Sequence, residues 1–105
     1  MMINTELEFK LNNNETVKLT LNFALLLKIK NKYPEEYESF NKVVLYGDKK
    51  DIDFFELLSV IYVAYLCANL DNKEKYTKEE FISLVPFDVQ LITQTQNRLL
   101  GYRKN

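Results

Sequence analysis

Carboxylates are the only abundant side chains in this sequence that could carry out acid–base chemistry. They form one cluster, Glu35, Glu36 and Glu38, and one pair, Glu79 and Glu80. Neighbouring carboxylates can act as a general acid and a general base. At the start of a helix, however, acidic residues also match the positive end of the helix dipole. Both groups lie where we expect helices to begin, so we interpret them as structural.

A third acidic group has a spacing superficially like that of a calcium-binding loop. It consists of Asp48, Asp51 and Asp53. An EF-hand loop also needs a glycine for its sharp turn and a closing glutamate, and neither lies at the required offset. We therefore expect a solvated turn that ends in a helix N-cap. We predict no metal site and no cofactor.

The composition excludes several other kinds of site. The 105 residues include no histidine, so the chain offers neither a histidine base nor a histidine metal ligand. The one cysteine, Cys67, excludes a disulfide framework, and the two glycines exclude a glycine-rich phosphate loop. Cys67 lies in an apolar stretch, where we expect a buried thiol. We therefore predict that the protein is not an enzyme.

The charge and hydropathy of the chain narrow the classes of partner. The net charge of −1, from 14 basic and 15 acidic residues, gives no electrostatic footprint for nucleic acid. The uncharged stretch over residues 57–70 is shorter than the roughly 20 residues that a membrane-spanning helix needs. No signal peptide is apparent, and a free cysteine fits the cytoplasm. We expect one cytoplasmic domain over residues 1–105 that binds neither nucleic acid nor membrane.

Two segments near the N-terminus alternate between apolar and polar residues. Residues 5–11 and 15–21 both have this period of two, and asparagines 12–14 separate them. The pattern predicts a β-hairpin with Phe9 opposite Val17, because asparagine tolerates the left-handed backbone that a short loop needs. One face of this hairpin is apolar, so other elements must cover it.

The remainder of the chain has the pattern of short helices. Capping and helix-breaking residues mark the expected boundaries: Asn22, Pro34, Gly47, Thr77, Glu80, Pro86, Asp88 and Gly101. The expected apolar faces are Leu25, Leu26, Ile29 and Tyr33 in the first helix, Tyr37, Phe40 and Val44 in the second, and Val89, Ile92, Leu99 and Leu100 in the last.

Residues 52–70 are apolar around nearly the whole circumference of a helix. Such a helix is surrounded by protein. We expect a central core helix, one side of which is buried only on self-association. The whole sequence therefore predicts an α+β fold, in which an N-terminal β-hairpin packs on a small bundle of about five helices.

Three aromatic residues of this central helix are candidate contacts with a protein partner. They are Phe55, Tyr62 and Tyr65. Tyrosine is enriched at protein interfaces, and a buried tyrosine hydroxyl must find a hydrogen-bond partner. A position at the edge of the core explains each of the three equally well, so both interpretations stay open.

The order of these patterns resembles the tail assembly chaperones of long-tailed phages and prophages of low-GC Gram-positive bacteria. The resemblance covers nearly the whole chain and is strongest in residues 61–69 and 77–86. The segments that carry it, after the alternating hairpin, are Leu25-Leu26-Leu27-Lys28, Tyr33-Pro34, the Tyr37 and Phe40 helix, the run from Leu58 to Asn69, Tyr76-Thr77 and Glu79-Glu80-Phe81.

The resemblance implies a non-catalytic assembly factor. Such a protein binds and solubilises the tape measure protein in the host cytoplasm, helps to recruit the tail tube protein, and is absent from the mature virion. It also implies a homo-oligomer. The alternative is a structural phage protein, such as a head–tail connector, which would remain in the particle.

Overall fold

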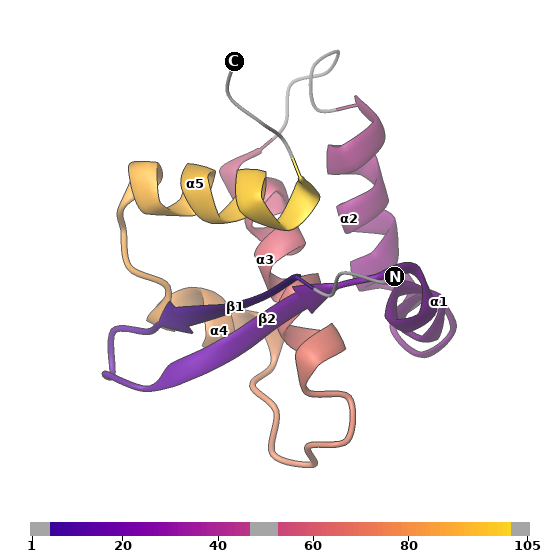
Figure 1. The fold of residues 1–105 in the computed structure, drawn as a ribbon, viewed down its shortest axis with the longest axis horizontal. Coiled ribbons are helices and arrows are strands. Elements are labelled where there is room, and N and C mark those ends of the chain that lie inside the picture. Colours follow the sequence, from indigo (N-terminus) through magenta and orange to yellow (C-terminus); the bar gives the residue numbers. More distant parts are fainter. Residues whose placement is uncertain (1–4, 47–52, 102–105) are drawn as a thin grey trace.

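The computed structural model describes residues 5–46 and 53–101, which form a two-stranded antiparallel sheet followed by five helices (Figure 1). The strands are β1 (Thr5–Lys10) and β2 (Thr16–Leu21). The helices are α1 (Phe23–Lys32), α2 (Pro34–Tyr46), α3 (Phe54–Ala68), α4 (Lys78–Leu84) and α5 (Val89–Leu100). The predicted α+β fold, an N-terminal hairpin with a small helical bundle, is confirmed.

The hairpin has the register that the alternating pattern predicts. Phe9 pairs with Val17 and Leu7 with Leu19, and all four side chains are buried. Because side chains alternate between the two faces of a strand, a shift by one residue would turn this whole set to solvent. Burial of the apolar face therefore determines the register.

The turn of the hairpin uses a left-handed asparagine, as expected. Asn14 has a φ of 70°, and the Leu11 backbone N–H donates to the Glu15 carbonyl over 2.8 Å. The Asn12 backbone N–H donates over the same distance to the carbonyl of Leu84, at the end of α4. This bond attaches the turn to the helical part of the fold.

Helix α3 lies at the centre of the molecule, where β2 and the other four helices pack around it (Figure 1). Every residue from Leu58 to Cys67 is buried, and Ile61 is completely inaccessible to solvent. A helix that is apolar on all sides needs such an environment. The chain itself supplies it, so the prediction that one side of this helix is buried only on self-association is wrong.

The predicted caps form at the starts of the helices. Side chains of Asn22, Asp53, Thr77 and Asp88 accept hydrogen bonds from the first turns of α1, α3, α4 and α5. Gly101 ends α5 with a φ of 76°, a left-handed conformation that glycine adopts without strain. The predicted cap at Gly47 and the acidic residues Asp48 and Asp51 lie outside the described residues.

The predicted apolar side of α1 packs on the core, whereas that of α5 differs in part from the observed one. On α1 Ile29 is fully buried, and Leu25, Leu26 and Tyr33 are half-buried against the core. On α5 the side chain of Val89 is exposed. Thr95 is buried there together with Ile92 and Leu99, because the spacing of three and four residues places them on one face.

Within residues 5–46 and 53–101, no helix combines the length and the hydropathy needed to cross a membrane.

Candidate interaction surfaces

The tyrosines predicted as partner contacts lie in the core. Tyr62 is 5% exposed and Tyr65 is 3% exposed. The Tyr62 hydroxyl donates to the backbone carbonyl of Tyr76, and the Tyr65 hydroxyl accepts from the N–H of the same residue, both over 2.9 Å. Burial raises the pKa of both phenols above the ordinary value. This geometry agrees with the core interpretation of the two residues and leaves them no surface for a partner.

Phe81 completes this aromatic cluster from α4. Its ring centroid lies 4.8 Å from that of Tyr65 and 5.5 Å from that of Tyr62. Aromatic pairs at such separations add to the stabilisation that burial itself provides. The cluster therefore holds α4 and the segment before it against α3.

Tyr76 also connects the α3–α4 segment to the hairpin. Its hydroxyl donates a short hydrogen bond to the Glu15 carboxylate and accepts one from the Asn13 side chain over 3.2 Å. The bond to Glu15 is the main reason why the pKa of Tyr76 is raised. Nothing in the local sequence indicates this connection, because the partners are more than 60 residues apart.

The remaining titratable groups with perturbed pKa values have structural roles. Burial raises the pKa of the Cys67 thiol to about 12, so this residue is not an activated nucleophile. The Glu56 carboxylate lies 2.7 Å from the Lys42 ammonium, and their hydrogen bond lowers the pKa of Glu56. Among the described residues, no three histidine, cysteine or acidic side chains are arranged to bind a metal ion.

Phe55, the third predicted contact residue, is exposed at the start of α3. Its side chain is 60% exposed, and Phe87, which follows the end of α4, is 89% exposed. These two side chains border a shallow hollow of about 260 Å³. We call this surface the Phe55 patch, and its residues are Phe54, Phe55, Leu58, Ile82, Val85, Pro86, Phe87 and Ile92.

A larger apolar hollow, of about 660 Å³, lies between α1, α2 and the C-terminal end of α5. We call it the α1–α2 groove, and its lining is Leu21, Asn22, Phe23, Leu26, Leu27, Lys30, Tyr37, Phe40, Asn41, Val44, Leu45, Leu99 and Leu100. Phe23 is 89% exposed, and Leu27 and Leu45 are exposed as well. Sequence reasoning assigned Tyr37, Phe40 and Val44 to the core face of α2 and did not identify the groove.

The signal for this groove was present in the sequence but ambiguous. Residues 23–27 are apolar without interruption, so they cover more of the helix circumference than one buried face requires. Such a run predicts excess apolar surface, but only the packing of α1 against α2 and α3 decides which side chains remain outside.

Comparisons with protein-family models, with curated proteins and with solved structures give no match for this chain. Its function must therefore be inferred from its own surfaces.

Proposed function

We propose that this protein is a non-catalytic phage tail assembly chaperone that binds and solubilises the tape measure protein and helps to recruit the tail tube protein. The observation that carries the proposal is the exposed apolar surface of a small, well-packed domain. Phe23, Phe55 and Phe87 all project into solvent although the core of the domain is complete without them. Apolar surface of this kind is typical of proteins that bind other proteins.

The Phe55 patch is the surface that we assign to the tape measure protein. Phe55 lies on the first turn of α3, which the Asp53–Glu56 capping box holds in place. Phe87 follows Pro86, whose ring restricts the backbone beside it. Aromatic side chains are enriched in the cores of protein interfaces, so these two are suited to anchor a partner.

An amphipathic helix of the client fits the shape of this patch. Its lining is apolar throughout, and a hollow beside two projecting rings can accept side chains from one face of a helix. The acidic residues Asp53 and Asp88 flank the patch in the sequence. We therefore expect the client helix to present apolar residues to the rings and basic residues at its borders.

Co-expression with fragments of the tape measure protein tests this proposal. The parent protein should retain a fragment through purification, and Phe55→Ser and Phe87→Ser should each release it. Tyr62→Ser is not a useful variant, because Tyr62 is buried and the change would disturb the core. Glu74→Ser, an exposed change in the α3–α4 segment, serves as the control.

Two results would contradict the proposal. A parent protein that never retains any tape measure fragment rules out the chaperone function. A protein that co-sediments with purified phage particles favours the alternative, a structural component such as a head–tail connector, because we expect the chaperone to remain in the host cytoplasm.

A further inference from the structure

The α1–α2 groove is apolar both in its lining and at its rim. Leu26, Val44 and Leu100 are partly buried in the lining, whereas Phe23 and Leu27 project into solvent beside them. The hollow between them has a volume of about 660 Å³. A hollow that recessed and projecting apolar side chains both border is typical of a surface that binds another protein.

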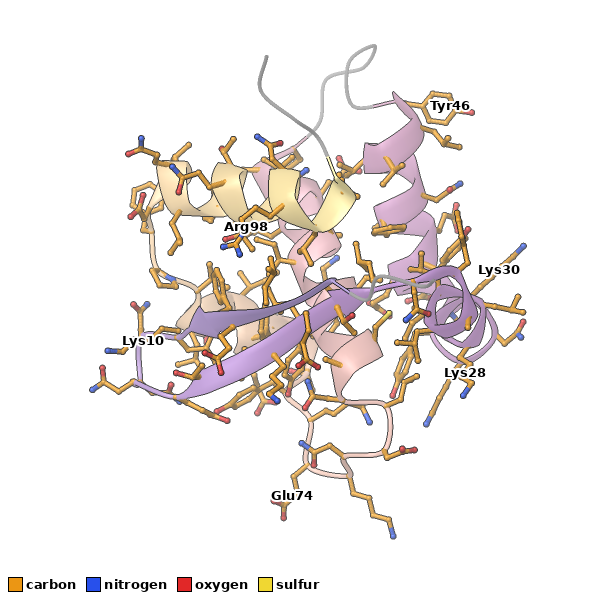
Figure 2. All side chains as sticks on the ribbon, in the orientation of Figure 1. Lys10, Lys28, Lys30, Tyr46, Glu74 and Arg98 are labelled. Atoms are coloured by element: carbon orange, nitrogen blue, oxygen red, sulfur yellow. The ribbon has the colours of Figure 1, made fainter. Side chains whose placement is uncertain are left out.

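The groove also presents an unpaired positive charge. Among the described residues that line it, Lys30 alone is charged, and the acidic residues of α2 lie outside the lining. The Lys30 ammonium lies 5.9 Å from the ring centroid of Tyr37 and forms no ion pair within residues 5–46 and 53–101. Figure 2 shows Lys30 extending outward from α1. A partner that fills the groove therefore meets a cation that can pair with a carboxylate.

The shape of the groove favours a helix over a small ligand. A small ligand would fill the hollow and leave the exposed side chains of Phe23, Leu27 and Leu45 in water. An amphipathic helix has apolar side chains at spacings of three and four residues, so it can fill the hollow and cover the projecting side chains at once. The Asn41 side-chain amide, which lines the groove and forms no hydrogen bond within the described part of the chain, can bind a polar group on the border of that helix.

We propose that the α1–α2 groove binds an amphipathic helix of another protein, with a carboxylate of this helix paired to Lys30. Apolar side chains of the helix enter the hollow beside Val44 and Leu100. Phe23 and Leu27 pack along its flank. Because complementary charges across an interface set the choice of partner, the groove favours such a helix over one with basic borders.

The groove and the Phe55 patch therefore favour helices of opposite charge. The patch is flanked in the sequence by Asp53 and Asp88, whereas Lys30 lines the groove. Like charges across an interface are unfavourable, so one helix does not suit both surfaces. The proposal for the groove does not rest on the proposed chaperone function, since it follows from the lining of the groove alone.

Selection from a displayed library of amphipathic helices tests the charge preference. Each member of the library has one apolar face, and the positions at its borders are randomised among glutamate, glutamine and lysine. Helices whose binding Phe23→Ser weakens are the ones that occupy the groove, and with the parent protein they should carry glutamate at the borders. With Lys30→Glu they should carry lysine. Lys28→Glu changes the same residue type on α1 outside this groove, so it should still select glutamate.

Fluorescence anisotropy of one selected helix measures the apolar contacts. Phe23→Ser and Leu27→Ser should each raise the dissociation constant about tenfold, because each removes apolar area that binding buries. Val89→Ser is the matched control, since Val89 is 57% exposed and Leu27 is 60% exposed, but Val89 does not line the groove. Circular dichroism confirms that each variant is folded.

The same measurement tests the charge contact. Lys30→Glu should raise the dissociation constant of the glutamate-bearing helix roughly fivefold, because attraction becomes repulsion at an exposed site. At physiological ionic strength charges are screened beyond about 8 Å, so Lys28→Glu should have little effect.

Three results would overturn the proposal. The first is a library that yields no helix whose binding depends on Phe23. The second is a set of groove-binding helices whose border charge does not change between the parent and Lys30→Glu. The third is a parent protein that forms a dimer which Phe23→Ser abolishes, since a second copy of the chain would then occupy the groove. None of these experiments contains a tape measure fragment, so their outcome is separate from that of the proposed chaperone function.

Discussion

The hydroxyls of Tyr62 and Tyr65 together bind both backbone polar groups of Tyr76. One donates to its carbonyl and the other accepts from its N–H. Backbone groups that leave water need such partners, because an unsatisfied donor or acceptor destabilises the fold. The same two tyrosines therefore contribute apolar surface to the core and fix the position of a segment that has no regular structure of its own.

Removing either hydroxyl should destabilise the protein. We expect Tyr62→Phe and Tyr65→Phe each to lower the free energy of unfolding by about 1 kcal/mol, because each leaves one backbone group of Tyr76 without its partner. Urea denaturation measures this change. Tyr37→Phe is the matched control, since it also keeps the ring but removes no bond to Tyr76. Equal stability of all three variants would show that the two hydroxyls contribute nothing.

The buried thiol of Cys67 makes the stability of the protein depend on alkaline pH. Burial raises its pKa from 9.0 to about 12. Above pH 9 the unfolded chain releases this proton while the folded chain retains it, so the free energy of unfolding falls as the pH rises towards 12. Below pH 9 the contribution of Cys67 is fully present. Cys67→Ala should flatten this decline in urea denaturation measured at successive pH values, and an unchanged slope would contradict the assignment.

Helix α3 determines whether the other elements can pack at all. β2 and the other four helices contact it, and its central residues are inaccessible. A cavity at its centre cannot be relieved by a movement of one neighbour, because neighbours surround it on every side. The tolerance of the fold to substitution should therefore be lowest along this helix.

Ile61→Ala should lower the free energy of unfolding by about 2–5 kcal/mol, since it removes fully buried carbon atoms and leaves a cavity. A thermal melt measures the loss. Phe55→Ala lies on the same helix but is exposed and should have a much smaller effect. Equal melting temperatures for Ile61→Ala and the parent would mean that α3 is not the central element.

At the scale of elements, local patterns determine much of the fold. The register around Phe9 and Val17 follows from the alternation of apolar residues, and the cap at Thr77 follows from local hydrogen bonding.

The exposed faces were harder to predict. The run over residues 23–27 is compatible with several buried faces, and the role of Tyr62 as a core residue depends on Tyr76, which α3 does not contain. Sequence alone also missed the α1–α2 groove, because β2, α1, α2 and α5 together create it.

For the whole molecule, client binding should depend little on salt. The net charge is −1, so long-range attraction contributes little to client binding. We expect retention of tape measure fragments to persist at high ionic strength, because the Phe55 patch binds through apolar side chains. Pull-down at low and high salt measures this retention, and loss of the client at high salt would contradict this prediction.

The position of α3 has a consequence for how the chain folds during its synthesis. The hairpin leaves the ribosome before α3, which covers its apolar face and begins at residue 54. The hydrogen bond from Asn12 to Val85 joins residues that are 73 positions apart. A two-stranded hairpin is marginal in water by itself, and contacts of long sequence separation form slowly. The hairpin of the nascent chain is therefore fully packed only after residue 85 has emerged.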